Sequence, residues 1–356
     1  MRRISILLLI LFTCFALVSW SQTEQHWKPK IITFDAPGAG SGSGQGTFGY
    51  GIVAGGAIGG YYIDSSNVSH GFVRTPDGTI TEFDVPGAAA TAVNGMNQEG
   101  AITGYYFDTI GAFHSFLRAP DGTITTFDPP DAGSGKGQGS SGNDINPKGE
   151  IGGGYVDSSN VNHGFLRTPD GTITEFDVPG APQGLNTEFG TFYALNPSGD
   201  YVGFYYDSGG VSHGWVRAPN GQIQDFDATG AGTGSGQGTF SVGINPKKAI
   251  TGWYVDSTNA SHGFLRSLQG KYTTIDPKGS QGTICVSVTP SDEVAGFYFN
   301  ANGVHGFSRS NRGEITSFDV TGAVGATFVN GNNPAGAITG YYLDSAGAAH
   351  GYLRLP

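Results

Sequence analysis

The sequence has few cysteines, few basic residues and only one long apolar run, and each shortage excludes a class of protein. Two cysteines in 356 residues cannot supply a disulfide framework, so the fold must be held together by packing. Lysine and arginine number 18 against 29 acidic residues, which gives a formal net charge of −11. Because binding to a nucleic-acid backbone needs clustered basic side chains, nucleic acid is not an expected partner.

The one long apolar run belongs to an expected signal peptide, residues 1–21. Two arginines precede an apolar stretch over residues 4–18, and small residues flank a cleavage point after Ser21. The run is too short and wrongly flanked for a stable membrane span. We therefore expect a secreted, extracellular protein without a transmembrane segment, whose mature domain covers residues 22–356. Its net charge would be about −13, from 16 basic and 29 acidic residues.

The two cysteines have different expected fates. Cleavage after Ser21 would remove Cys14 and leave Cys285 as the one thiol, without an internal disulfide. Lipidation of Cys14 is the alternative. It is disfavoured because Thr13 directly precedes the cysteine and the apolar run continues past it.

Beyond the leader, one unit is repeated, and it is clearest in His163–Asp177, HGFLRTPDGTITEFD. Two short runs rich in aromatic and β-branched residues flank Asp170-Gly171, which is a strong signal for a β-hairpin. Two further runs upstream, Gly142–Asn146 and Ile151–Asp157, give four expected antiparallel strands per unit. Glycine and proline make up about 22% of the chain and recur at turns, which favours an ordered repeat over disorder.

The unit occurs seven times, but the chain begins and ends in the middle of a unit. The His-x-aromatic-x-Arg motif begins at His70, His114, His163, His213, His262, His305 and His350. The strand that follows it ends at Asp35, Asp84, Asp128, Asp177, Asp227, Asp276 and Asp319. The first of these strands, Ile31–Asp35, therefore precedes any histidine strand, and the last histidine strand, His350–Arg354, has no partner after it.

These complementary ends predict a closed ring. The copies are spaced 43 to 50 residues apart, which is typical of β-propeller blades. We predict an all-β fold, a seven-bladed β-propeller of four-stranded antiparallel blades, in which the N-terminal strand closes the last blade. A monomer is expected. An open solenoid is the alternative, and it is disfavoured because an open array needs no complementary ends.

The turns also predict a register. A two-residue Asp77-Gly78 turn would place Phe72 opposite Phe83, and a symmetric upstream loop would place Tyr62 opposite Phe72. Each blade would then carry a row of three aromatic side chains, with Ile275 replacing one of them in the fifth repeat. Because such rows give a blade an apolar face to press on its neighbour, we expect them in the core.

Each blade also repeats a histidine, an arginine and an aspartate, for which we expect structural roles. A catalytic site needs one such set, whereas this chain has seven. The expected register places Asp64 opposite His70 and Arg74 over Gly60, so that the aspartate can bond the histidine ring or the loop amides. The loops after these aspartates offer few charged oxygens for calcium, so neither a metal nor a cofactor is expected.

The motifs HGFLR and PDGTITEFD resemble those of bacterial extracellular repeat proteins of the HAF family, and the resemblance covers essentially the whole mature chain. It implies an exported, repetitive protein and carries no established activity, substrate or catalytic residue. The sequence has HGF, HSF, HGW or HGY in place of the family's triplet, which a Gly-for-Ala exchange accommodates.

Functional residues are expected where the copies differ. Long glycine-rich connections occur at residues 38–48, 131–142 and 229–240, and a differently composed one at 181–192. We expect them on one face, where a glycan or a cell-surface protein would bind. Candidate ligand-binding amides in these connections and the next one are Gln45, Gln138, Gln183, Gln237 and Gln281. The alternative is that such loops are slack linkers.

The expected inner strands carry one unusual carboxylate, Asp144, at a position that is otherwise small. Asp144 and Glu188 are candidates for a catalytic pair, since glycoside hydrolysis uses two carboxylates. A solvated aspartate in a wet channel is the simpler interpretation. We therefore favour a non-enzymatic binding or scaffold protein over a polysaccharide-acting hydrolase or lyase with its site at the central channel.

Overall fold

The protein is all-β in the computed structural model, which describes residues 29–181 and 194–356. These residues form 28 strands and no helix. No helix that could span a membrane occurs among them. Antiparallel pairing arranges the strands in repeated four-stranded sheets, here called groups 1 to 7 in chain order from β2.

Each group contains a first, second, third and fourth strand in the order of pairing. The first strands are β2 (Gly46–Ile52), β6 (Ala90–Met96), β10 (Gly139–Ile145), β14 (Ala194–Leu195), β18 (Gly238–Ile244), β22 (Gly282–Val288) and β26 (Thr327–Asn332). The second strands are β3 (Ile58–Ile63), β7 (Ile102–Phe107), β11 (Ile151–Val156), β15 (Tyr201–Tyr206), β19 (Ile250–Val255), β23 (Val294–Asn300) and β27 (Ile338–Leu343). The third strands are β4 (Ser69–Arg74), β8 (Phe113–Arg118), β12 (Asn162–Arg167), β16 (Ser212–Arg217), β20 (Ser261–Arg266), β24 (Gly303–Arg309) and β28 (Ala349–Arg354). The fourth strands are β5 (Ile80–Phe83), β9 (Ile124–Phe127), β13 (Ile173–Phe176), β17 (Ile223–Phe226), β21 (Tyr272–Ile275), β25 (Ile315–Phe318) and, for group 7, β1 (Ile31–Phe34).

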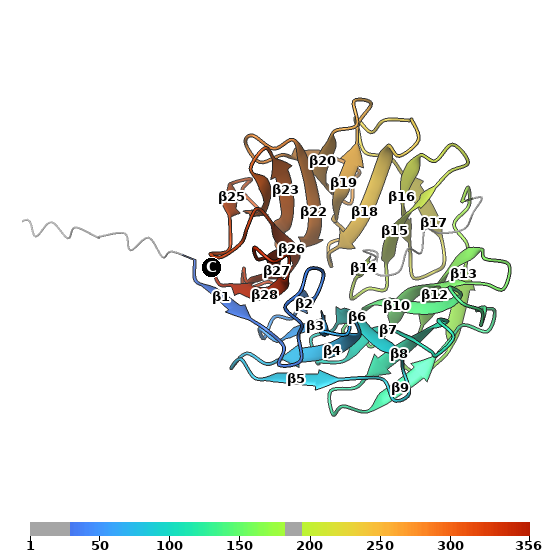
Figure 1. Ribbon diagram of the computed structural model, residues 1–356. Coiled ribbons are helices and arrows are strands. Elements are labelled where there is room, and N and C mark those ends of the chain that lie inside the picture. The colour runs from blue at the N-terminus through green and yellow to red at the C-terminus, as the bar shows by residue number, and fades with distance from the viewer. Residues whose placement is uncertain (1–28, 182–193) are drawn as a thin grey trace, which may run out of the picture.

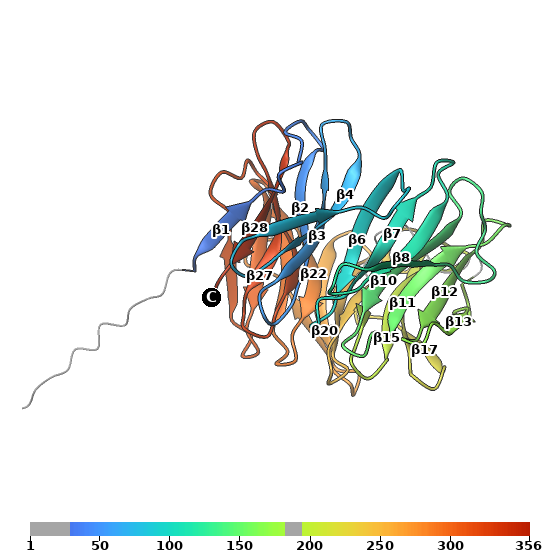
Figure 2. The same ribbon diagram turned by 90° about the horizontal axis from the view of Figure 1, so that it is seen from below.

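The two ends of the described chain complete one sheet, as predicted. β1 pairs with β28 antiparallel, from Ile31 opposite Arg354 to Phe34 opposite Gly351, and the two strands lie side by side in Figure 1 and in Figure 2. Figure 1 shows the groups around a common centre, with first strands such as β2 and β6 near the middle and fourth strands such as β5 and β9 at the rim. The first strands contact one another in sequence, and β26 returns to β2.

Three junctions between groups carry a further parallel bridge between a third strand and a first strand, and an isolated parallel bridge, Val304 with Ala326, lies between groups 6 and 7. Gly46 pairs with Ala349, Gly139 with Phe113 and Gly238 with Ser212. These bridges join groups 7 and 1, groups 2 and 3, and groups 4 and 5 into three eight-stranded sheets, whereas group 6 forms a four-stranded sheet. We call these three the bridged junctions. Each lies where a long glycine-rich connection enters a first strand.

The predicted register was wrong by one residue in the outer hairpin. Gly71, not Phe72, lies opposite Phe83. The reason is that the turn spans three residues: Thr75 N donates to Thr79 O at 2.8 Å, and Gly78 N donates to Thr75 O at 2.9 Å with Gly78 at a φ of +98°. A one-residue slip reverses the face of every side chain.

The inner hairpin also differs from the predicted register. Its loop is shorter than expected, since Asp64 N donates to Val68 O at 2.9 Å. Gly60 therefore lies opposite Phe72, and Tyr62 lies opposite His70. Neither Asp64 opposite His70 nor Gly60 opposite Arg74 is observed, and the predicted rows of three aromatics across one sheet do not form.

The aromatic side chains instead pack between groups. Phe83 of group 1 meets Phe116 of group 2 edge to face, with ring centroids 6.1 Å apart. The same contact recurs for Phe34–Phe72, Phe127–Phe165, Phe176–Trp215 and Phe318–Tyr352. The repeated arginine lies over the same ring, with the Arg118 guanidinium carbon 4.8 Å from the Phe83 centroid. Such cation–π contacts stabilise by about 0.5–2 kcal/mol each, and the aromatics are core residues as expected.

Candidate functional site

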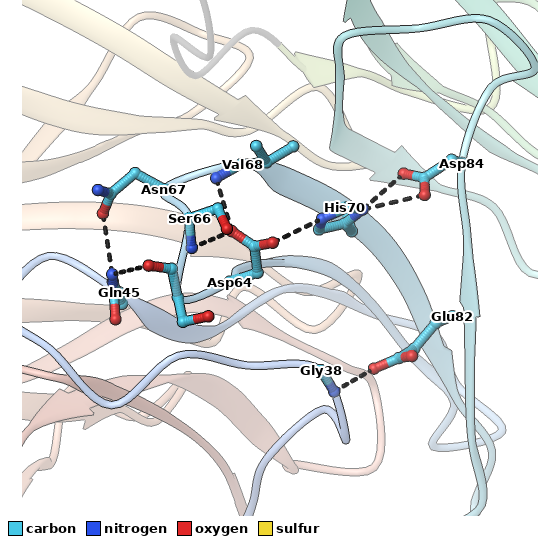
Figure 3. A network of polar contacts seen from close by, with 10 residues as sticks. Gly38, Gln45, Asp64, Ser66, Asn67, Val68, His70, Glu82 and Asp84 are labelled. Atoms are coloured by element: carbon cyan, nitrogen blue, oxygen red, sulfur yellow. Dashed lines mark hydrogen bonds and ion pairs between the residues drawn. The ribbon is translucent and has the colours of Figure 1, made fainter.

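A ring of histidines lies at one end of the sheets, each held between two polar partners. His70 Nδ1 lies 2.9 Å from Asp84 Oδ2, and its Nε2 lies 3.7 Å from Asp64 Oδ2 (Figure 3). Asp64 Oδ1 accepts hydrogen bonds from the Ser66 and Val68 amides at 2.8 Å each. The aspartate therefore bonds the loop amides, which was one of the two expected roles, and its second oxygen lies near the histidine ring without a hydrogen bond. The other histidines with two acidic partners are His114, His163, His213, His262 and His350.

Gln45 clamps the long connection that enters β2. Its Oε1 accepts a hydrogen bond from Gly42 N at 2.9 Å. Its Nε2 donates to the Ser65 carbonyl at 3.2 Å and to Asn67 Oδ1 at 3.0 Å, so the side chain joins the connection to the hairpin loop of group 1 (Figure 3). Both ends of the amide are therefore used inside the protein.

The other long connections repeat this clamp. Gln138 makes the same three contacts, and Gln237 bonds Gly234 N and Asn259 Oδ1 at 2.9 Å each. At the far end of the first connection, Gly38 N donates to Glu82 Oε1 at 2.7 Å (Figure 3). The alternative that these loops are slack linkers is therefore wrong for the three bridged junctions. Whether their glutamines contact a ligand stays a prediction.

Gln281 stands in a short connection and is not clamped. A recess of about 330 Å³ lies between the start of β20 and residues 276–282. Its polar lining consists of Ser261, His262, Asp276, Ser280 and Gln281. The Gln281 side chain is exposed, and no hydrogen bond joins its amide to another of the described residues. In the equally short connection before β6, Ala89 takes this place, with its N–H bonded like that of Gln281.

The recess holds a hydrogen-bonded histidine that sequence reasoning assigned only to the scaffold. His262 Nδ1 lies 2.8 Å from Asp276 Oδ2. Burial alone would lower the pKa of His262, but the hydrogen bonds and charges of Asp276 and Asp256 outweigh burial and raise that pKa above its ordinary value. The free amide is the feature that distinguishes this place, and the short connection before Gln281 was the sequence signal for it.

Asp144 lines a cavity of about 200 Å³ at the centre of the ring. Its neighbours there include Asn94, Asn143, Ser287 and Asn330, all from first strands. Asp144 Oδ1 accepts from Ile145 N and Oδ2 from Leu195 N, at 2.8 Å each. Burial raises the pKa of Asp144 to about 6, although these two hydrogen bonds favour the charged form.

The second half of the predicted carboxylate pair cannot be placed, because Glu188, like Gln183, lies outside the described residues. Asp144 is the one carboxylate among the described residues that line the central cavity. The catalytic pair therefore stays a prediction.

No family model matches the chain, and no curated protein does. Solved structures with a similar fold include a streptogramin B lyase, at 16% identity and a TM-score of 0.58 over 92% of this chain and 98% of that one. They also include the BP39L lectin from Burkholderia pseudomallei, at 12% identity and a TM-score of 0.55 over 84% of this chain and 92% of that one. The shared property is a propeller-like fold.

The arrangement offers hydrogen bonding more readily than metal chemistry. Within residues 29–181 and 194–356, no three His, Cys, Asp or Glu side chains are grouped so as to hold a metal ion. The acidic partners of the histidines, Asp276 of the recess included, are engaged in hydrogen bonds, and the recess adds an amide and two hydroxyls. Such groups suit a neutral ligand rich in hydroxyls.

Proposed function

We propose that this chain is an exported, non-enzymatic β-propeller that binds a glycan in the recess beside Gln281. The seven groups would be its blades, residues 1–21 its signal peptide and residues 22–356 its single domain. The protein would be a monomeric member of the HAF family of extracellular repeat proteins. The free amide of Gln281 carries the proposal, because the corresponding amides of Gln45, Gln138 and Gln237 are bonded within the protein.

The chemistry of the recess supports a sugar ligand. An amide and two hydroxyls each both donate and accept hydrogen bonds, and a carboxylate accepts them, which matches the hydroxyls of a sugar. The volume of about 330 Å³ lies at the lower end of the range for ligand pockets, roughly 300–1,000 Å³. A recess of this size suits a short sugar unit rather than a long chain.

The fold adds support by analogy. The similar structure from Burkholderia pseudomallei is a lectin, so a propeller-like fold of this kind is compatible with sugar recognition. The analogy concerns the architecture alone, and the residues that carry the proposal are those of this chain.

A glycan screen with the mature chain tests the proposal. Binding of residues 22–356 to immobilised glycans is compared with that of Gln281→Ala and of the matched control Gln138→Ala. We expect Gln281→Ala to weaken binding roughly tenfold, since an unpaired polar group costs about 1–3 kcal/mol, and Gln138→Ala to bind as the parent does. Equal binding by all three proteins would overturn the proposal, as would the absence of binding to any of the glycans.

A polysaccharide-acting hydrolase or lyase is the second candidate, favoured by one observation. Asp144, with a pKa of about 6, would exchange a proton readily near neutral pH, as a general acid or base must. The same glycans, incubated in solution, distinguish the two candidates. Shortening of the glycans by the parent but not by Asp144→Asn would establish the enzyme.

A further inference from the structure

A crevice between groups 4 and 5 lies at the opposite end of β20 from the recess. Its volume is about 460 Å³, larger than that of the recess or of the central cavity. Its aliphatic wall consists of Val216, Ile223, Ile244 and Ile250. Its rim carries Gln222, Gln224, Lys248, Arg266 and Leu268, and the buried Asp200 also lines it. The crevice therefore combines an apolar surface with charged and amide groups.

The rim departs from the repeat at several positions. Leu268, which is 57% exposed, stands where other groups have Pro76, Pro120, Pro169, Pro219 and Pro356. Gln224 stands where other groups have Thr81, Thr125, Thr174, Thr273 and Thr316. Five other groups adopt the same fold with proline or threonine at these positions. The fold therefore does not require Leu268 or Gln224.

Lys248 occupies a position that favours glycine. Its φ is +63°, a conformation that L side chains rarely adopt. The corresponding residues in other groups include Gly56, Gly100, Gly149, Gly199 and Gly336. Lys248 Nζ donates to Asp200 Oδ1 at 2.9 Å, and Asp200 is only 2% exposed. The lysine therefore forms a fixed part of the rim with its charge compensated.

Arg266 is a cation without an acidic partner. Its guanidinium carbon lies 4.6 Å from the Phe226 ring centroid and 5.9 Å from that of Tyr272. In groups 1 to 3 an aspartate in the following turn acts on the arginine through its charge, namely Asp77, Asp121 and Asp170. Group 5 has Gln269 at this place. Arg266 Nε has no hydrogen-bond partner, as is also true of Arg74, Arg118, Arg217 and Arg354, and no ion pair involves Arg266 among the described residues.

We propose that this crevice binds a small amphipathic anion. The apolar body of the ligand lies on the aliphatic wall, and its carboxylate or sulfonate accepts charge-assisted hydrogen bonds from Arg266. The exposed amides of Gln222 and Gln224 bond polar substituents at the rim. The positive charge is local, since the chain as a whole has a net charge of −11. The site is separate from the glycan recess and does not depend on it.

Fluorescence titration of the mature chain with 8-anilinonaphthalene-1-sulfonate tests the proposal. This dye has an apolar body and one sulfonate, and its emission rises on binding to an apolar surface. We expect saturable binding of one dye per chain. Ala218→Trp, which fills the crevice, should abolish the signal. Arg266→Gln should weaken binding roughly tenfold, as expected for a lost charge-assisted hydrogen bond, and should leave binding of the uncharged N-phenyl-1-naphthylamine unchanged.

Two matched variants separate binding from folding. Ala119 and Arg217 occupy the positions of Ala218 and Arg266 in other groups, and Ala119 and Ala218 have equivalent turn hydrogen bonds of 2.8 Å. Ala119→Trp and Arg217→Gln should therefore keep full dye binding. Non-saturable binding, an unchanged signal in Ala218→Trp, or equal losses in the matched variants would overturn the proposal.

Discussion

The bridged junctions and the junction between groups 5 and 6 use the same Gln-Gly dipeptide for different purposes. At the bridged junctions a long connection folds back on itself, its glutamine bonds the neighbouring hairpin loop, and its glycine pairs with the preceding group. Before β22 the connection is about five residues shorter, so Gln281 reaches no such partner. The glutamine thus stabilises the connection at the three bridged junctions, whereas the side chain of Gln281 is not bonded to any other of the described residues. Connection length, rather than the dipeptide, decides between the two roles.

The largest expected difference between the two kinds of junction is the stability lost when the glycine of the Gln-Gly dipeptide is replaced by alanine. A Cβ on Gly46 would lie 2.0 Å from Ala349 O, and Gly46 has a φ of +112°. Gly46→Ala should therefore lower the free energy of unfolding by about 3 kcal/mol or more, from backbone strain and a clash with a fixed carbonyl. At Gly282 a Cβ would meet Ser261 Oγ at 2.5 Å, and this hydroxyl can rotate away. Gly282→Ala should cost about 1 kcal/mol.

Denaturant unfolding of both variants measures this difference. Gly142→Ala, within β10, is not a suitable control because its Cβ would also clash, 2.2 Å from Thr103 Oγ1. Gly44→Ala is better, because it has a positive φ of +79° but no atom within 4 Å of the added Cβ. A loss in Gly46→Ala no greater than that in Gly44→Ala would show that the parallel bridge is unimportant.

A smaller difference is expected at the glutamine. Gln237→Ala removes hydrogen bonds to Gly234 N and Asn259 Oδ1, and should lower the free energy of unfolding by about 1 kcal/mol. The Gly234 amide should also exchange its hydrogen faster. Gln281→Ala should leave stability within about 0.5 kcal/mol of the parent, as at other surface positions. Equal losses in the two variants would mean that Gln281 has a structural partner after all.

The sequence predicted the large features of the fold because they repeat. The phase of the motifs indicated that Phe34 and Gly351 belong to one sheet, and β1 does pair with β28. The turns were less predictable. An Asp-Gly pair is compatible with loops of two or three residues, and Gly78 belongs to a three-residue loop. This single residue reversed the face on which Phe83 was expected.

Contacts between groups could not be predicted from the sequence either. The packing of Phe83 on Phe116, with Arg118 over its ring, joins residues whose proximity depends on how neighbouring sheets stack. The candidate site was only partly predictable. Gln281 could be named from its loop, whereas the recess depends on what the loops around it leave empty. The crevice beside Arg266 was not predicted, although Leu268 and Lys248 already depart from the repeat.

The smallest expected effect concerns a feature that both kinds of junction share, the histidine–aspartate pair. His350 with Asp35 belongs to a bridged junction, and His262 with Asp276 to the unbridged one. For both histidines burial alone would lower the pKa, but the bonds and charges of their aspartates raise it above the ordinary value of 6.5. Because the folded pKa is the higher one, each pair contributes stability that is fully present below pH 6.5 and is lost as the pH rises through the folded pKa.

Replacing either histidine by glutamine should therefore flatten the fall in stability above pH 6.5, by a similar small amount in His350→Gln and His262→Gln. Thermal unfolding of the parent and both variants between pH 5.5 and pH 8.5 measures the effect. Equal changes in the pH dependence of stability would mean that the two histidine–aspartate pairs contribute equally at both junctions. The junctions would then differ in their connections alone. A change in His350→Gln only would instead make the long connection part of the titrating unit.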